Sequence, residues 1–185
     1  NAMINEVLKE QVMEDIVLLW LIGVKVVLGH GGGPEISETM AKLGKKAEFV
    51  GGLRVTDKET VDIVQMVLAG KVNKTLVNLL EMKGGKAMGI SGMDGRLIEA
   101  QIKDEKLGYV GKITKIHINP VTDLLEKGYI PVISTVGCDK QGNTYETKSY
   151  IVKEIFFDEP YLMKSAYYAD KISQYLVDIA EGKRI

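Results

Sequence analysis

The sequence is organised around a glycine-rich turn, His30-Gly31-Gly32-Gly33-Pro34, which follows the β-branched run at residues 24–28. We expect a strand over residues 24–29 and a helix from Pro34 to about residue 43, ended by Gly44. Glycine removes the Cβ that would block a ligand from the backbone, and proline suits the first position of a helix. Because the N–H groups at a helix start attract anions, the turn indicates either an anion site or simply a tight turn.

Length and charge limit the classes of protein that this chain can belong to. Its 185 residues allow one domain with a core, or one domain with an appendage, and the net charge of −1 gives no electrostatic case for nucleic acid or an anionic membrane. The single cysteine, Cys138, excludes an internal disulfide, and no zinc-type cluster surrounds it, so we expect an inert thiol and no metal site. The longest apolar stretch, residues 16–27, is broken by Gly23 and Lys25, and no signal peptide is visible. We therefore expect a cytoplasmic protein.

Helical periodicity alternates with strand-like runs along the chain. Helices are expected over residues 4–22, from a capping box of Thr56 and Glu59 to about residue 69, from residue 71 to 82, and over residues 120–127. Strands are expected at residues 87–90 and 130–134, an antiparallel ribbon at residues 97–102 and 109–118, and a loop and turn at residues 137–143. Hairpin turns are expected at Gly51-Gly52 and at Asp94-Gly95.

This alternation predicts an α/β fold, a three-layer sandwich with a mainly parallel central sheet, plus a β-hairpin or ribbon. The last forty residues differ in character, with a strand expected over residues 148–157 and a helix over residues 160–181. We expect residues 1–145 to form one lobe, and residues 146–185 to form a divergent strand and helix that pack on the same domain.

Three motifs in succession resemble the amino-acid kinase family, and within it the N-acetylglutamate kinases. They are His30-Gly31-Gly32-Gly33-Pro34-Glu35-Ile36, Gly52-Leu53-Arg54-Val55-Thr56 and Gly70-Lys71-Val72-Asn73-Lys74. Tyr109-Val110-Gly111 and the run at residues 128–133 agree in order and spacing, so that the resemblance covers residues 1–145. It implies an amino-acid kinase-like N-terminal lobe, and transfer of the γ-phosphoryl group of ATP to the side-chain carboxylate of N-acetyl-L-glutamate, an early step of arginine synthesis.

The resemblance also implies roles for individual residues. Gly32 and Gly33 would present backbone N–H groups to the substrate, and Arg54 would pair with its α-carboxylate, for which the planar fork of arginine donors is suited. The alternative for Arg54 is a solvated surface charge. We expect His30 to support the loop and His117 to be structural or exposed, and we assign no catalytic residue. In the family the first lobe also forms a homodimer through the helix before residue 70 and an adjoining strand.

Departures from the family pattern are equally informative. Related kinases place a strand with a phosphoryl-stabilising lysine before Asn1-Ala2-Met3, and an asparagine where this chain has Glu146, whose carboxylate should repel an anionic ligand. The family's ATP-binding half finds no match after residue 146. We therefore expect a truncated homologue that is inactive alone, with ATP and magnesium implied by the resemblance but not bound by this chain.

Three alternatives stay open at this point. The chain could be a non-enzymatic dimeric module that keeps a pocket for an acyl-glutamate or similar carboxylate, or a partner chain could supply the missing half. A different small-molecule kinase of the same superfamily is disfavoured by the Gly52-Leu53-Arg54-Val55-Thr56 run. We further expect an open slot in the sheet beside residues 24–29, filled by the strand at residues 148–157.

Overall fold

The computed structural model describes residues 6–147 of the chain. The chain divides into two compact units, Asn1–Ser149 and Tyr150–Ile185, and every described residue belongs to the first. The strand and helix expected over residues 148–157 and 160–181 therefore lie outside the described residues. The division at residue 145 stays a prediction.

A three-stranded parallel sheet forms the centre of the fold. Its strands β1 (Leu28–His30), β7 (Ile130–Ser134) and β4 (Ala87–Ser91) lie in the order β1-β7-β4. Strand β1 is shorter than the expected residues 24–29, because a turn at Gly23 leaves the Val24 N–H donating to the Leu19 carbonyl at the end of the first helix. Within the described residues β1 lies at the edge of this sheet, and the strand expected beside it is not among them.

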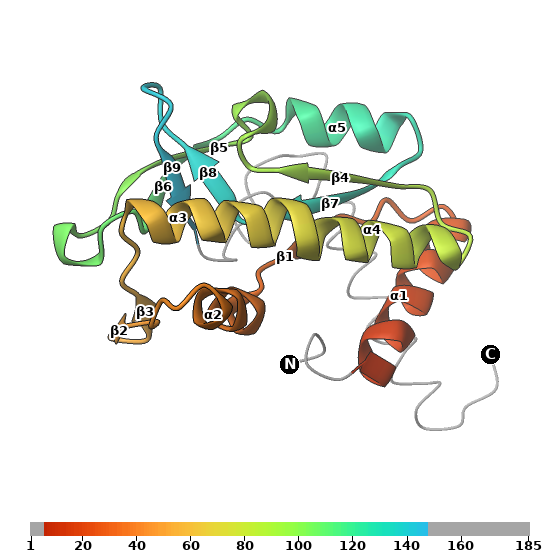
Figure 1. Ribbon diagram of the computed structural model, residues 1–185. Helices are drawn as coiled ribbons and strands as arrows, with labels where there is room; N and C mark the ends of the chain where they lie inside the picture. The colour runs from red at the N-terminus through yellow and green to blue at the C-terminus, as the bar shows by residue number, and fades with distance from the viewer. Residues whose placement is uncertain (1–5, 148–185) are drawn as a thin grey trace. The chain divides into compact units, whose positions relative to one another are not determined.

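Helices cover both faces of the parallel sheet, which gives the layered α/β architecture expected from the sequence (Figure 1). Helix α4 (Asn73–Met82) contacts β4 and β7, while α5 (Asn119–Glu126) contacts β7 from the other side. Helix α1 (Glu6–Leu21) packs against α4. The buried apolar side chains between these elements include Met13, Val17, Ile36, Met40, Val64, Leu68, Leu76, Leu80, Ile130 and Val132.

One continuous helix replaces the two helices expected on either side of Gly70. It begins as α3 (Lys58–Gln65), continues as the π-helical segment η1 (Met66–Val72) and ends as α4 (Figure 1). The expected break is wrong because Gly70 keeps helical backbone, and buried residues on both sides, such as Val67 and Val72, bind the helix to the core. Tertiary packing here overrides the weak helix propensity of glycine.

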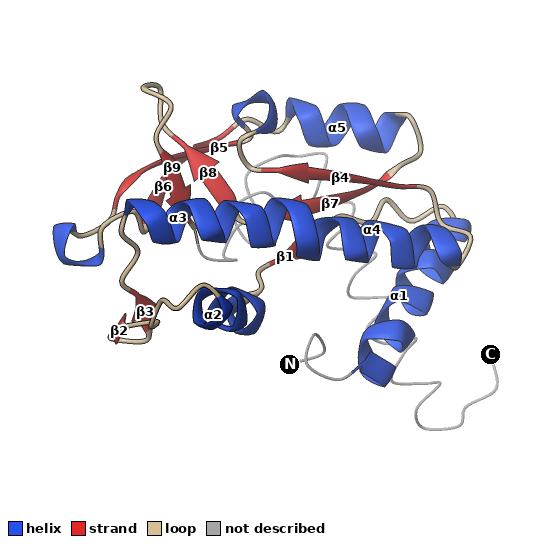
Figure 2. Cartoon of the chain, viewed as in Figure 1, coloured by secondary structure: helices blue, strands red, loops and turns tan. Residues whose placement is uncertain are grey.

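A second sheet of four strands stands beside the first (Figure 2). Its order is β6 (Gly111–Ile116), β5 (Ile98–Ile102), β8 (Val136–Cys138) and β9 (Thr144–Glu146). The antiparallel ribbon of β5 and β6 is confirmed. The loop expected at residues 137–143 is shorter than predicted, since β8 continues to Cys138 and pairs with β9 around the turn.

The hairpin expected at Asp94-Gly95 is wrong. The Oδ2 atom of Asp94 accepts bonds from both N–H and Oγ of Ser91, which makes a short 3-10 turn, η2 (Asp94–Arg96). Strand β4 then stays in the parallel sheet while β5 pairs with β6. A second 3-10 turn, η3 (Glu105–Leu107), connects β5 to β6.

The segment after the glycine turn follows the sequence expectations closely. Helix α2 (Gly33–Lys42) carries Pro34 in its first turn, and strands β2 (Phe49–Val50) and β3 (Leu53–Arg54) form the expected hairpin. Gly51 and Gly52 have φ values of 56° and 74°, which the tight hairpin turn requires. The expected capping box is wrong, because Asp57, not Thr56, caps α3 by accepting from the Thr60 N–H.

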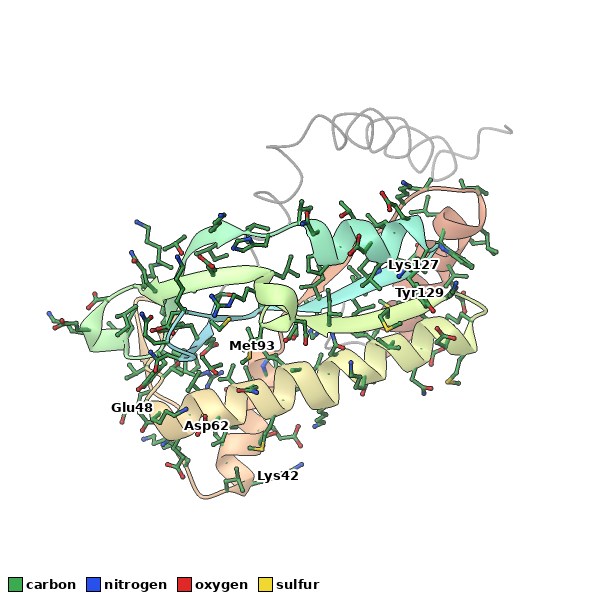
Figure 3. All side chains as sticks on the ribbon, turned by 90° about the horizontal axis from the view of Figure 1, so that it is seen from above. Lys42, Glu48, Asp62, Met93, Lys127 and Tyr129 are labelled. Atoms are coloured by element: carbon green, nitrogen blue, oxygen red, sulfur yellow. The ribbon has the colours of Figure 1, made fainter. Side chains whose placement is uncertain are left out.

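The turn between α5 and β7 is fixed by contacts from other elements. Lys127 and Tyr129 lie together at this turn (Figure 3), and Lys86 Nζ donates to the Lys127 carbonyl while lying 4.2 Å from the centre of the Tyr129 ring. Trp20 of α1 donates its indole N–H to the Gly128 carbonyl. None of the helices within residues 6–147 combines the length and the apolar character needed to cross a membrane.

The close approach of α4 to β4 depends on the absence of a side chain at Gly89. A Cβ there would overlap Oδ1 of Asn73 and lie 2.8 Å from Nζ of Lys74. We predict that Gly89→Ala lowers the free energy of unfolding by about 1–3 kcal/mol, the usual range for overpacking. Urea denaturation followed by circular dichroism measures this change.

Gly70→Ala is the matched control, because a Cβ at Gly70 meets no atom of another element or side chain within 4 Å in the part of the chain that the structure describes. The same substitution there should be neutral or stabilise the helix by about 0.5–1 kcal/mol. Equal destabilisation by the two variants would contradict the proposed contact.

Candidate functional site

The candidate site lies at the carboxyl ends of the parallel strands, where ligands commonly bind in α/β proteins. His30 of β1, Ser134 of β7 and Ser91 of β4 are direct neighbours in register across this edge of the sheet. His30 is followed by the glycine turn and then by α2. The sequence therefore brings the glycine turn to the strand ends, as expected from the strand–turn–helix pattern.

The glycine turn packs tightly on the long helix at one position. A Cβ on Gly32 would lie 2.9 Å from Cδ2 of Leu68 and 3.1 Å from Cγ2 of Val72, both in the π-helical segment η1. At Gly31 and Gly33 a Cβ would meet no atom of residues 6–147 within 4 Å. Packing thus favours glycine at residue 32, because a larger residue would displace the Leu68 side chain. Within the described residues, positions 31 and 33 leave room beside the start of α2, where the first N–H groups of a helix lack intrahelical partners.

Asn73 holds the strand ends and the long helix together. Its side chain is fully buried, and Nδ2 lies 3.1 Å from Nε2 of His30, 3.3 Å from the Ile90 carbonyl and 2.9 Å from the Val132 carbonyl. One amide group of the helix therefore reaches β1, β4 and β7. Lys74 completes the arrangement by donating to Oδ1 of Asn73 and to the Gly89 carbonyl.

The contacts of His30 define its proton position. Nδ1 lies 3.0 Å from the Gly31 carbonyl, which can only accept, and Nε2 faces the amide nitrogen of Asn73, which can only donate. The ring is therefore neutral with its proton on Nδ1. Burial lowers the pKa of His30, more than the carboxylate of Glu35 and the Gly31 carbonyl raise it. His30 supports the turn in the way expected from the sequence.

Arg54 is brought directly onto the glycine turn. Its Nη2 donates to the Gly33 carbonyl and to Oγ of Ser37, both at 3.1 Å, and the Phe49 ring lies 4.9 Å from its Cζ. Only 5% of Arg54 is exposed, so the alternative of a solvated surface charge does not fit. Burial lowers the pKa of the guanidinium, and the nearby Glu146 carboxylate opposes that shift.

Glu146 and Thr56 complete this side of the site. Oε2 of Glu146 accepts from Oγ1 of Thr56 at 2.9 Å and lies 3.8 Å from Nε of Arg54. Sequence reasoning placed Glu146 near the ligand but missed its pairing with Arg54. It also missed the hydrogen bond from Thr56 to Glu146. Thr56 was expected to cap α3, a role that Asp57 fills instead.

Three buried polar atoms at this edge lack hydrogen-bond partners among the described residues: Oε2 of Glu35, Nε of Arg54 and Oγ of Ser134. Such atoms are uncommon in folded proteins, and a bound water or ion or a functional role is the usual explanation for them. Ser134 adjoins His30 in register, Arg54 donates to Gly33, and Glu35 lies in the first turn of α2. Together they surround the glycine turn.

Within the described residues we find neither a metal site nor an activated cysteine nucleophile. No three histidine, cysteine, aspartate or glutamate side chains within residues 6–147 form a group that could hold a metal ion. Cys138 is buried, and burial raises the pKa of its thiol, which disfavours the nucleophilic thiolate. The groups at this site that would attract an anion are the guanidinium of Arg54 and the start of α2 beside the glycine turn.

Comparison with known proteins identifies the family. Residues 3–152 match the amino acid kinase family, and the chain belongs to it. The chain is 52% identical over 150 residues to an acetylglutamate kinase of Halothermothrix orenii, covering 78% of this chain and 52% of that protein. It is 46% identical over 169 residues to an acetylglutamate kinase of Clostridioides difficile, covering 88% and 59%. The chain spans about half the length of the curated relatives it matches.

Solved structures support the fold. The chain is similar to smu.665 from Streptococcus mutans UA159, with 27% identity and a TM-score of 0.69, over 73% of this chain and 56% of that one. It also resembles in fold an N-acetylglutamate synthase from Neisseria gonorrhoeae, with 24% identity and a TM-score of 0.62, over 75% of this chain and 32% of that one. The amino-acid kinase-like α/β fold expected from the sequence is confirmed.

The burial of His30 makes the stability of the lobe depend on pH. Because its pKa is lowered in the folded state from about 6.5, the unfolded chain takes up a proton first as the pH falls. We predict that the free energy of unfolding decreases below about pH 7, by at most about 1.4 kcal/mol per pH unit, and levels off below the folded pKa. Urea denaturation at pH 8, 7, 6 and 5.5 measures this slope.

The chain has two histidines, so His117→Gln serves as the control for His30→Gln. The slope should persist in the first variant and flatten in the second. An unchanged slope in His30→Gln would contradict the assignment. Asp57 does not contribute in this range, because hydrogen bonds from Lys45 and Thr60 lower its pKa to about 2.

Proposed function

We propose that the described lobe is the substrate-binding half of an acetylglutamate kinase and binds N-acetyl-L-glutamate. The observation that carries this proposal is the buried Arg54, whose guanidinium adjoins the glycine turn and donates to Gly33. The names of the relatives supply the substrate, and the family supplies the reaction, transfer of the γ-phosphoryl group of ATP to a carboxylate.

Each residue of the site has a stated part in this proposal. Gly32 and Gly33, at the start of α2, would present N–H groups to the substrate, with the positive end of the helix dipole behind them. Arg54 would pair with the α-carboxylate. His30 and Asn73 would position the turn without touching the substrate, because their polar atoms are bonded to each other and to the strands.

ATP and magnesium belong to the proposed reaction rather than to the described site. The histidine, cysteine, aspartate and glutamate side chains within residues 6–147 form no group that fits a metal ion. The expectation that this chain alone transfers no phosphoryl group stays a prediction, and an ADP-release assay tests it. Heat in calorimetry with N-acetyl-L-glutamate and none with magnesium-ATP would indicate a substrate-binding lobe without a nucleotide site.

We predict that Arg54→Lys weakens binding of N-acetyl-L-glutamate about tenfold to a hundredfold, because lysine keeps the charge but loses the planar fork of donors. Isothermal titration calorimetry measures the dissociation constant. Arg96→Lys, at an exposed position in η2, is the matched control and should bind as the unmodified chain does. Equal affinity of the two variants would contradict the role of Arg54.

We further propose a homodimer formed through the long helix. Met66 in η1 is 58% exposed, so this helix presents an apolar side chain at its surface, and the resemblance to the family implies that subunits pair through the helix before residue 70. We predict that Met66→Glu shifts the protein towards monomer in sedimentation equilibrium, because a charge at an apolar contact must be desolvated.

Ile102→Glu in β5 is the control, since Ile102 is 47% exposed but lies off the long helix. It should leave the molecular mass unchanged. A monomer at all concentrations in the unmodified protein would contradict the proposed dimer while leaving the carboxylate site unaffected.

A further inference from the structure

We propose that the carboxylate of Glu146 occupies the side of Arg54 that a ligand carboxylate would take, so that the chain limits the affinity of its own site. This inference rests on the proposed function, because it assumes that Arg54 serves a carboxylate ligand. Glu146 would thereby lower the affinity of the Arg54 site for a ligand carboxylate.

The contacts of Arg54 use both donors of Nη2 and leave the Nε donor for a carboxylate. Nη2 is used by the Gly33 carbonyl and Oγ of Ser37, and Nη1 lies 3.4 Å from Sδ of Met40. The Phe49 ring covers one flat face. Among the described residues Nε has no hydrogen-bond partner, and it forms an ion pair with Oε2 of Glu146 at 3.8 Å.

Glu146 is held at this place by the fold. Its backbone pairs with Val136 in the second sheet, and its N–H donates to the Tyr109 carbonyl at 2.9 Å. Its side chain is 20% exposed, and Oε2 accepts from the fully buried Thr56. Thr56 stands two residues after Arg54, so β3 and its continuation supply both the cation and the donor that orients the anion.

An attached carboxylate competes well with a free one. Because Glu146 belongs to the same folded unit as Arg54, its effective concentration at the guanidinium far exceeds that of a dissolved ligand. A ligand carboxylate that approaches Arg54 must either displace Glu146 or lie beside a second negative charge, which is unfavourable in a partly buried site. Removing the charge of Glu146 should therefore strengthen binding.

The test compares Glu146→Gln with the unmodified protein by calorimetry with N-acetyl-L-glutamate. Glutamine keeps an oxygen that can accept a hydrogen bond from Thr56, but it is neutral and cannot form an ion pair with Arg54. We expect the dissociation constant to fall at least tenfold, and Arg54→Lys added to Glu146→Gln to remove the gain. If the glutamine variant does not fold, Glu146→Asn supplies a second neutral side chain.

Glu48→Gln is the matched control, since Glu48 is an exposed glutamate one residue before β2 (Figure 3). It removes the same charge near the hairpin and should leave the affinity unchanged. An equal gain from both variants would mean that only net charge matters, which would overturn the proposal.

A second measurement follows Arg54 without any ligand. The Nε–Hε resonance of Arg54, assigned by its loss in Arg54→Lys, should shift in Glu146→Gln and stay in place in Glu48→Gln. An unmoved resonance in Glu146→Gln would overturn the proposal whatever the calorimetry gives.

The two proposals fail in different ways. Equal, measurable affinities of the unmodified protein and Glu146→Gln would overturn the inference and leave the proposed function standing. Absence of binding in both proteins would contradict the proposed function, and it would also overturn the inference, because removing the competing charge would have uncovered no site.

Discussion

The buried amide of Asn73 is the contact on which the candidate site depends. It extends from the long helix to the His30 side chain and to carbonyl groups of β4 and β7, so that one residue sets the distance between the helix and all three parallel strands. A buried amide without partners would be unfavourable by about 1–3 kcal/mol per lost bond, which makes other placements of this helix costly. Gly89 admits the side chain by having none of its own. The glycine turn then follows, because His30 ends the strand that Asn73 holds.

The π-helical segment explains how Asn73 comes to face the sheet. Buried residues along this helix repeat every four positions at Val64, Leu68, Val72, Leu76 and Leu80. In a regular α-helix of 3.6 residues per turn, steps of four drift by roughly 40° each, and the buried stripe would wind away from the core. A segment with i→i+5 bonds takes more residues per turn and removes part of that drift. The same segment packs against Gly32, so the helix that holds the strands also supports the turn.

Periodicity and glycine placement were sufficient to predict the parallel strands, the hairpin of β2 and β3, and helices α2 and α5. The sequence failed where a single side chain chooses between two local structures. Asp57 competes with Thr56 for the cap of α3, and Asp94 bonds back to Ser91 instead of allowing a hairpin. Asn73 belongs to the motif Gly70-Lys71-Val72-Asn73-Lys74, but the sequence analysis assigned it no structural role. A polar residue among the apolar residues of a helix face is a signal for a buried hydrogen-bond network. The pairing of Arg54 with Glu146 joins residues 92 positions apart in sequence, a separation that local patterns cannot bridge.

If Arg54 binds a ligand carboxylate as proposed, stability and binding would oppose each other in this lobe. A guanidinium that is 5% exposed needs a counter-charge when no ligand is present, because an unpaired buried charge is strongly destabilising. Glu146 provides that counter-charge from β9 and thereby links the second sheet to the hairpin that carries Arg54. Yet the same electrostatic attraction is what a ligand carboxylate would use. On the proposed role of Arg54, a chain with a neutral residue at position 146 would have a less stable empty lobe and a more receptive site, whereas this chain balances the charge of the arginine with its own carboxylate.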